Sequence, residues 1–270
     1  SGGVDSTVLL HVLNAMKDEL SLSLAVCHLN HNLRHAESTR DMEFVKGLSA
    51  RLGLQFAGKV LGEGACSPAG ESLQARARAL RYDFFEETAE RFKAAKIALG
   101  HNLDDSAETV VMRLLKGSSL AGLSGIPPAR GRYVRPLILV SRKEIEAYAK
   151  ENSIRHVTDS SNLSLKYLRN DVRNRLIPYL KRRYNPNITE TIARTAEVLR
   201  IDDLFLEEAA LGAYSSSVVA QASDTVVMDR QSLVSMHRAL SSRVFLRAAR
   251  ELVPEIELQS CHIDAFFSLI

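Results

Sequence analysis

The stretch SGGVDSTVLLHVL, residues 1–13, decides the fold. Gly2 and Gly3 lack a Cβ atom, so the backbone there can adopt positive φ and approach a ligand closely. Apolar residues then recur at helical spacing, which predicts a helix beginning near Asp5. The unpaired amides at the start of that helix favour an anion site suited to phosphate, with a plain capped turn as the alternative. Three hydroxyl side chains add possible donors: Ser1, Ser6 and Thr7. No Gly-Lys-Ser/Thr follows, so this is not a Walker A loop.

Strands and helices alternate up to about residue 140. A phosphate loop normally follows a strand, and no strand precedes Ser1, so we expect the natural chain to begin further upstream. Strands are predicted at 22–29, 54–61, 96–102 and 133–138, and helices at 37–53, 71–95, 104–117 and 141–152. Ser38 is a possible N-cap, Ser141 and Glu144 form a possible capping box, and Gly117 closes a helix. This alternation predicts an α/β fold, a parallel twisted sheet of the Rossmann-like type with helices on both faces.

After about Thr158 the pattern becomes helical, with 215–224 as a connection or weak hairpin. We expect a catalytic domain over residues 1–185, a helical linker over 186–215 and the start of a C-terminal domain over 216–270. The last residues, IDAFFSLI, present an apolar helical face with no capping signal after it. We therefore expect the natural chain to continue beyond Ile270.

The composition is typical of a globular protein in a reducing compartment. Of the 270 residues, 46% are hydrophobic and 25% are charged, with a net charge of +3. No apolar run is long enough to cross a membrane. Cys27, Cys66 and Cys261 lie far apart and form no CxxC pair, so neither a disulfide framework nor a zinc site is indicated. We expect a cytoplasmic protein with no membrane partner.

The segment GHNLDDSAET, residues 100–109, is a candidate metal site. It follows a predicted strand and enters a helix, so it should face the same crevice as the glycine loop. Asp104, Asp105 and Glu108 can gather on neighbouring helix faces. Magnesium prefers one or two carboxylates with phosphate oxygens and water. The alternative is an acidic capping box from Asp105 to Glu108.

The segment HLNHNLRHAES, residues 28–38, lies at the end of the strand predicted at 22–29. Its histidines suggest zinc, but no thiolate and no HExxH pattern accompanies them, so zinc is disfavoured. Arg34 at a strand end is better placed to meet phosphate or a nucleobase. A solvated polar loop is the alternative.

Basic residues concentrate between residues 159 and 187. Arg169 and Arg173 share a helix face, and Arg175 lies nearby. Such a stripe is a candidate footprint for a nucleic-acid backbone, and a solvated helix face is the alternative.

Together these segments resemble the PP-loop ATP pyrophosphatases, and within them the tRNA(Ile)-lysidine synthases. SGGVDS resembles the phosphate loop shared by many of these enzymes. The blocks GLSGIPP and RNDVRNRLIP are similar to segments more specific to the lysidine synthases. The resemblance covers residues 1–185 closely and the remaining helices more loosely.

The resemblance implies a role for each matching segment. The loop holds the ATP polyphosphate through Ser1, Gly2, Gly3, Val4, Asp5 and Ser6. His31 and His101 lie beside the nucleotide, and Asp5 and Asp105 are candidates for Mg²⁺. Catalysis falls to Asp104, Asp105, Glu108 and Arg34. The tRNA meets Arg169, Asn170, Arg173 and Arg175.

The implied reaction joins free L-lysine to tRNA(Ile) with a CAU anticodon. ATP first adenylates the wobble cytidine, and lysine then displaces AMP. Oxyanion charge on the phosphates suits helix amides, cations and a metal, and the lysine amine needs a base. Asp104, Asp105 and His101 all remain possible as that base. Relatives suggest a homodimer.

Three other functions are compatible with the same fold. A tRNA thiolation enzyme normally needs cysteines, often paired, and those of this chain are isolated. An amide-forming synthetase for small molecules has no need of the basic helix after Asp159. A non-catalytic nucleotide- or RNA-binding protein has no need of the acidic segment beside the phosphate loop.

Overall fold

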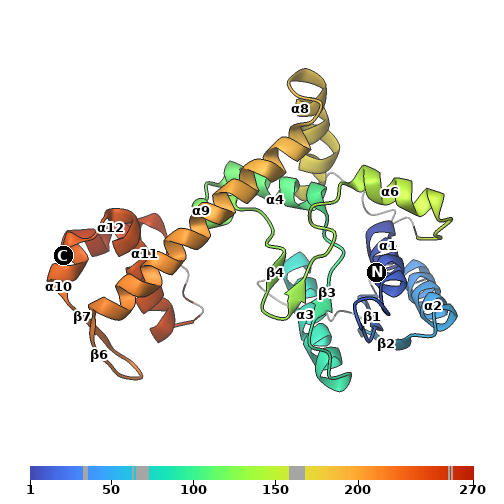
Figure 1. Ribbon diagram of the computed structural model, residues 1–270, viewed down its shortest axis with the longest axis horizontal. Helices are drawn as coiled ribbons and strands as arrows, with labels where there is room; N and C mark the ends of the chain where they lie inside the picture. Colours follow the sequence, from blue (N-terminus) through green and yellow to red (C-terminus); the bar gives the residue numbers. More distant parts are fainter. Residues whose placement is uncertain (33–35, 63, 65–72, 158–167, 255, 257) are drawn as a thin grey trace. The chain divides into compact units, whose positions relative to one another are not determined.

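The computed structural model describes residues 1–32, 36–62, 64, 73–157, 168–254, 256 and 258–270. The chain divides into two compact units (Figure 1). The first comprises Ser1–Gly117 and Gly125–Arg194, and the second comprises Ser118–Ser124 and Thr195–Ile270.

The first unit alternates helices with short strands. Its helices are α1 (Val4–Ala15), α2 (Ala36–Arg51), α3 (Leu73–Arg91), α4 (Leu103–Lys116), α6 (Arg142–Glu151), α7 (Leu168–Asp171), the π-helix η2 (Val172–Leu176), α8 (Ile177–Arg183) and the first turns of α9 (Ile188–Ser217). Its strands are β1 (Ala25–Asn30), β2 (Gln55–Val60), β3 (Ile97–Ala98), β4 (Ala129–Arg130) and β5 (Tyr133–Val134).

Two parallel pairs confirm the predicted α/β class. β1 pairs with β2 from Ala25 opposite Gln55 to Asn30 opposite Val60. β3 pairs with β5 in the same sense, and β4 adds an antiparallel edge to β5. That edge was not predicted, because the sequence before β5 shows only turn residues. A positive φ of 58° at Gly131 forms the tight reversal that brings β4 back against β5.

Apolar helix faces cover these strands and one another. α1 packs on α6, with Val4, Val8 and Ile145 buried between them. α3 places Phe84 in one apolar cluster with Leu29 of β1 and Ala57 of β2. These contacts hold the start of α1 and the ends of β1 and β3 in one unit, which is where the candidate site forms.

Most predicted helix ends are confirmed. Gly117 closes α4 with a φ of 75°, and Ser141 and Glu144 form the expected capping box. The Ser38 cap was wrong: α2 begins at Ala36, so Ser38 already lies inside the first helical turn.

The second unit is a helical cluster with a hairpin. It contains α5 (Leu120–Leu123), the remainder of α9, β6 (Val218–Gln221), β7 (Val226–Met228), α10 (Arg230–Ser235), α11 (Arg238–Leu252) and α12 (Ser260–Leu269). β6 and β7 are antiparallel, which confirms the weak hairpin. Tyr214, Leu233 and Val244 form its core, against which Phe266 and Ile270 of the predicted apolar face pack.

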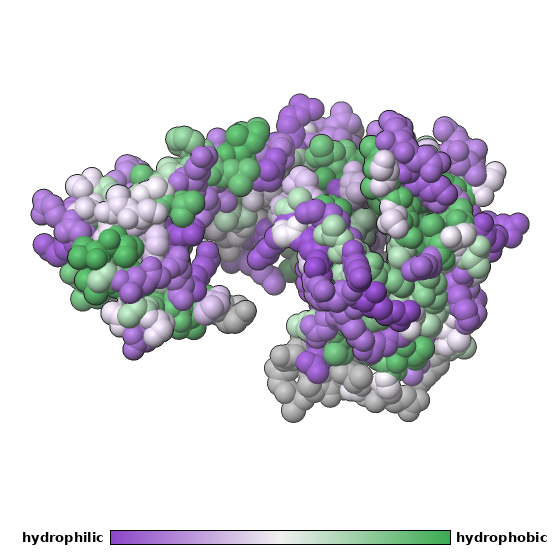
Figure 2. Space-filling model, turned by 60° about the horizontal axis from the view of Figure 1, so that its bottom comes forward, coloured by the Kyte–Doolittle hydropathy of each residue, from purple (hydrophilic) through white to green (hydrophobic). Residues whose placement is uncertain are grey.

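One face of the protein is mainly hydrophilic (Figure 2), as the share of charged residues in the sequence predicts. Hydrophilic side chains cover much of the face shown in Figure 2, with smaller apolar areas between them. Among the described residues, no helix combines the length and apolar character that crossing a bilayer requires.

Candidate functional site

The glycine loop runs directly into α1. Gly2 is buried with a φ of 85°, and its carbonyl oxygen accepts hydrogen bonds from the Val157 amide (2.8 Å) and the Thr7 hydroxyl (3.1 Å). A Cβ on Gly2 would lie 3.3 Å from Val45 Cγ2. Gly2 is therefore required by the packing of the loop itself, whereas a Cβ on Gly3 would come no closer than 3.7 Å to its nearest neighbour.

The loop hydroxyls organise the turn. Ser1 Oγ lies 2.9 Å from Ser6 Oγ, and Ser6 Oγ donates to the Gly3 carbonyl at 3.0 Å. Val4 begins the helix and is buried, so its contribution to a ligand is its backbone. The amides of the first turn have no partners within the helix and remain the donors suited to an anion.

Asp5 connects the loop to the acidic segment. Its Oδ1 accepts from Asn102 Nδ2 (2.9 Å) and its Oδ2 from Arg142 NH1 (2.6 Å). Burial raises the pKa of Asp5, and the Arg142 charge and the Asn102 hydrogen bond oppose that rise. The two loops meet closely, since a Cβ on Gly100 would lie 3.1 Å from the Ser6 nitrogen. The structure thus brings together the two segments that the sequence placed at one sheet edge.

The acidic segment caps α4 in a different way from the one predicted. Asn102 is the N-cap: its Oδ1 accepts from the Asp105 amide (2.9 Å), and Asp105 Oδ2 accepts from the Asn102 amide (3.1 Å). The proposed Asp105–Glu108 box was wrong, because α4 begins three residues earlier than such a box requires. Asp104 Oδ2 accepts from the backbone amide of Arg142 (2.7 Å), which ties the start of α6 to the start of α4.

Two arginines complete the cluster. Arg173 donates to Glu108 through Nε (2.6 Å) and NH2 (2.8 Å), and Arg169 Nε donates to Glu108 Oε2 at 3.0 Å. Both guanidinium groups also reach Asp105 Oδ1 at 3.0 Å. Glu108 is almost fully buried, with a side chain 3% exposed. Burial disfavours the charged form of Arg173, but the hydrogen bond and charge of Glu108 leave its pKa raised.

The other predicted tRNA residues lie on the same helical segment. Arg169 and Arg173 share a face, as predicted, and that face contacts carboxylates rather than solvent alone. Asn170 is half-buried in α7. Arg175 is exposed, with Asp171 as its ion-pair partner at 3.2 Å.

Two histidines near the loops are uncharged at neutral pH. Burial lowers the pKa of His101 to about 4, and burial together with the Arg81 charge lowers that of His31 to about 4. Arg81 Nε donates to His31 Nε2 at 3.3 Å. Arg34 lies outside the described residues.

The sequence interpretation missed Asn102, Arg142 and Arg81. Asn102 precedes the acidic pair as an ordinary N-cap residue, so capping rules provide a signal for it. Arg142 and Arg81 lie on separate helices among many other basic residues, and nothing local marks their partners.

The predicted metal ligands are Asp5 and Asp105. Within the described ranges, no three His, Cys, Asp or Glu side chains gather as a metal cage. Magnesium bound to phosphate needs only one or two carboxylates. Asn102 holds both of these side chains, and each Asp5 oxygen accepts one hydrogen bond and so retains a free lone pair. The residues therefore fit a metal that is completed by phosphate and water.

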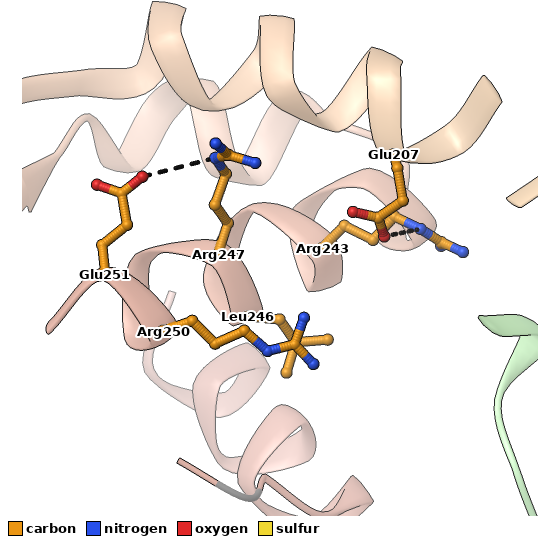
Figure 3. A pocket seen from close by; sticks show the side chains of 6 residues that line it. All are labelled: Glu207, Arg243, Leu246, Arg247, Arg250 and Glu251. Atoms are coloured by element: carbon orange, nitrogen blue, oxygen red, sulfur yellow. Dashed lines mark hydrogen bonds and ion pairs between the residues drawn. The ribbon is translucent and has the colours of Figure 1, made fainter. Parts of the chain in front are cut away.

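A pocket of about 240 Å³ lies in the second unit and contains none of the predicted site residues (Figure 3). It is lined by Glu207, Arg243, Leu246, Arg247, Arg250 and Glu251. Ion pairs from Arg243 to Glu207 and from Arg247 to Glu251 neutralise much of its lining.

The geometry of the first unit agrees with a family comparison. The PP-loop domain family matches residues 1–180, the part of the chain that contains the glycine loop and the acidic segment. The chain belongs to the PP-loop family. Among solved structures, this PP-loop chain is similar to the U34-tRNA thiolase NcsA from Methanococcus maripaludis, with a TM-score of 0.62 and 20% identity over 74% of this chain and 70% of that one. That likeness concerns the fold alone.

Curated relatives of the PP-loop chain include proteins named tRNA(Ile)-lysidine synthase. The protein from Clostridium acetobutylicum is 37% identical over 98% of this chain and 58% of its own length. Those from Clostridioides difficile and Geobacter sulfurreducens are 35% and 36% identical over all of this chain and 59% and 58% of their own lengths. The chain thus spans just under three fifths of these relatives.

Proposed function

We propose that this chain is the catalytic part of an ATP-dependent tRNA(Ile)-lysidine synthase. The observation that carries the proposal is Asn102, which holds Asp5 of the phosphate loop and Asp105 of the acidic helix at once. An anion site and a carboxylate cluster are thereby placed side by side. The relatives' name, tRNA(Ile)-lysidine synthase, supports a tRNA substrate. We propose tRNA(Ile) with a CAU anticodon and free L-lysine as the substrates, and the cytoplasm as the location.

The proposed reaction has two steps. The C2 oxygen of the wobble cytidine attacks the α-phosphorus of ATP, and the bond to the β-phosphate breaks and releases pyrophosphate. The neutral ε-amine of lysine then attacks C2, and the C2–O bond breaks with loss of AMP. The proton that leaves the amine must pass to a base.

The loop contributes binding and charge stabilisation. Backbone amides at the start of α1 face developing phosphate charge without reorganising. The loop residues concerned are Ser1, Gly2, Gly3, Val4, Asp5 and Ser6. A magnesium ion, when bound by Asp5 and Asp105, would supply further neutralisation of the polyphosphate.

The acidic residues divide between chemistry and positioning. Asp104 holds the amide of Arg142, and Glu108 holds two arginines, so both fix the geometry around Asp105. His101 is uncharged at neutral pH and has a ring nitrogen that can accept a proton, but burial lowers its pKa to about 4 and makes it a weak base. The oxygens of Asp105 already accept from guanidinium and amide donors, so the base is not assigned between them. Arg34 keeps its proposed role beside the nucleotide.

Four residues remain proposed tRNA contacts: Arg169, Asn170, Arg173 and Arg175. For Arg169 and Arg173 a phosphate would have to compete with Asp105 and Glu108. A homodimer and a C-terminal extension that contacts tRNA complete the proposal.

A tRNA thiolase is the second candidate, because the structural neighbour that carries this name has the same fold. The described cysteines oppose it. Cys27 is half-buried in β1, where burial raises its pKa, and Cys261 lies in the other unit. Thiolate chemistry needs a lowered thiol pKa, often in a pair.

The decisive experiment measures pyrophosphate and AMP release from ATP with and without tRNA and lysine. We expect pyrophosphate release to require a CAU-anticodon tRNA(Ile), and AMP release to require lysine as well. Pyrophosphate release without tRNA would indicate a small-molecule synthetase. Lysine-independent incorporation of sulfur into tRNA would indicate a thiolase.

A further inference from the structure

Helix α8 and its flanks present an unusual surface on the first unit. Residues 172–189 contain five arginines and lysines and no acidic residue. Arg173 faces the carboxylate cluster, and the other four basic side chains accompany two tyrosines. We call this set the α8 surface: Arg175, Tyr179, Lys181, Arg182, Arg183 and Tyr184.

The two tyrosines are exposed side by side. Tyr179 is 46% exposed and Tyr184 is 70% exposed. Their ring centroids lie 6.0 Å apart with an interplanar angle of 72°. Large aromatic side chains usually bury most of their area, so an exposed pair of rings offers apolar surface to a ligand.

The helix is anchored so that this surface faces away from the core. Val172 and Ile177 are buried against Val111 of α4, which fixes the inner face of the segment. Pro178 lacks an amide and would clash with the carbonyl four residues earlier in a regular α-helix, and the wider π-helix η2 precedes it. The tyrosines and basic residues occupy the remaining positions.

The charges of the α8 surface are available to an anion. Arg175 shares one exposed ion pair with Asp171. Arg182 and Arg183 are exposed, and the side chains of Lys181, Arg182 and Arg183 form no ion pair or hydrogen bond with any residue in the described part of the chain. A concentrated positive field without nearby acids attracts a polyanion.

Rings and cations together identify the type of polyanion. Proteins that bind single-stranded nucleic acid place aromatic rings, on which bases stack, along a positive surface that follows the phosphates. A paired helix offers no exposed base faces. A membrane surface would favour a longer helix with a continuous apolar face, which the seven residues of α8 do not provide.

We propose that the α8 surface binds unpaired nucleotides of the tRNA by stacking them on Tyr179 and Tyr184. The proposal rests on the proposed function. Tyr179 follows Arg173 by six residues, or about 9 Å along a helix, so the stacked bases would flank the nucleotide that reacts at the Asp105 and Glu108 cluster. The surface thus holds the loop while the cytidine enters the site.

The test measures the affinity of the full chain for a labelled anticodon stem-loop RNA and for a fully paired RNA duplex of equal nucleotide number, over a range of salt. Tyr179→Leu and Tyr184→Leu remove a ring, Tyr184→Phe keeps it, and Phe205→Leu removes an equally exposed ring (69%) in the second unit. We expect each Tyr→Leu change to weaken stem-loop binding about five- to tenfold without altering the salt slope. The Tyr184→Phe and Phe205→Leu variants should bind the stem-loop as the wild type does. No variant with a changed ring should bind the paired duplex more weakly.

Changes to the basic residues give the complementary result. Arg182→Ala and Arg183→Ala should each reduce the salt slope of stem-loop binding by about 0.7 units, the value for single strands. Unchanged stem-loop affinity in both Tyr→Leu variants would overturn the proposal. An equal loss of affinity of these variants for the paired duplex would also overturn it. So would variants that keep RNA binding but lose binding to anionic phosphatidylserine vesicles.

Failure of the proposed function can be distinguished from failure of this inference. If the wild type releases pyrophosphate on tRNA while the tyrosine variants bind the stem-loop normally, only the stacking surface is wrong. If the variants lose stem-loop binding but the wild type forms no lysidine, the stacking surface stands and the assigned reaction is wrong.

Discussion

Replacing Glu108 with Gln tests the buried cluster. Glu108 accepts three hydrogen bonds from Arg169 and Arg173, at 3.0, 2.6 and 2.8 Å. Gln keeps one oxygen but places an NH2 group against guanidinium donors, so at least one charge-assisted bond becomes a contact between two donors. A hydrogen bond to a charged group contributes about 1.5–3 kcal/mol, and breaking a buried pair costs about 3–5 kcal/mol.

The exposure of the two arginines favours a loss of stability near the lower limit of the range for a broken buried pair. The Arg169 and Arg173 side chains are 39% and 35% exposed, so water solvates them when Glu108 changes. Both also retain Asp105 Oδ1. We expect Glu108→Gln to lower the free energy of unfolding by about 2–3 kcal/mol.

Urea unfolding followed by far-ultraviolet circular dichroism measures this change as a lower midpoint with an unchanged m-value. The matched control is Glu197→Gln, which removes a half-buried ion pair with Arg200 one turn away in α9. Because the Glu197 side chain is 39% exposed, against 3% for Glu108, this change should cost less than about 0.5 kcal/mol. In 1 M NaCl the Glu197 effect should vanish while most of the Glu108 effect persists, because burial limits screening. Equal losses in the two variants would refute the argument.

Three further changes test the loops. Gly2→Val should destabilise the fold, because the φ of Gly2 is 85° and the new side chain would meet Val45. Gly3→Val should remain folded by circular dichroism but lose ATP binding measured by calorimetry. Normal ATP binding by Gly3→Val would exclude an anion site at the loop. Asp105→Asn keeps a side chain that can cap α4 but removes the negative charge that Arg169 and Arg173 share. We expect urea unfolding to show a free energy of unfolding lower by about 1–2 kcal/mol, together with loss of pyrophosphate release. Full activity of this variant would exclude a metal role for Asp105. Burial lowers the pKa of His28 to about 4, below its unfolded value, so its contribution to the free energy of unfolding is complete above about pH 6.5 and is lost as pH falls toward 4. His28→Asn should flatten that part of the stability profile, and an unchanged slope would contradict the lowered pKa.

Local rules predicted much of the fold. Helical periodicity after the glycine pair placed α1 correctly, and the capping residues Ser141 and Gly117 marked ends that the structure confirms. These features depend on neighbouring residues, whose interactions are the same in any context. The β4 edge was missed because two-residue strands carry no periodic signal and form only when a neighbour supplies hydrogen bonds.

The residue types of the candidate site were predictable, but their partners were not. The sequence alone indicated a phosphate loop, an acidic helix start and a basic helix, because each is a local arrangement of donors or charges. Only the tertiary structure decided that Arg142 binds Asp5 across 137 residues, and that Arg169 and Arg173 contact Asp105 and Glu108 as well as solvent. A charged side chain can pair with any opposite charge within reach, and the path of the chain through the core determines which charge that is.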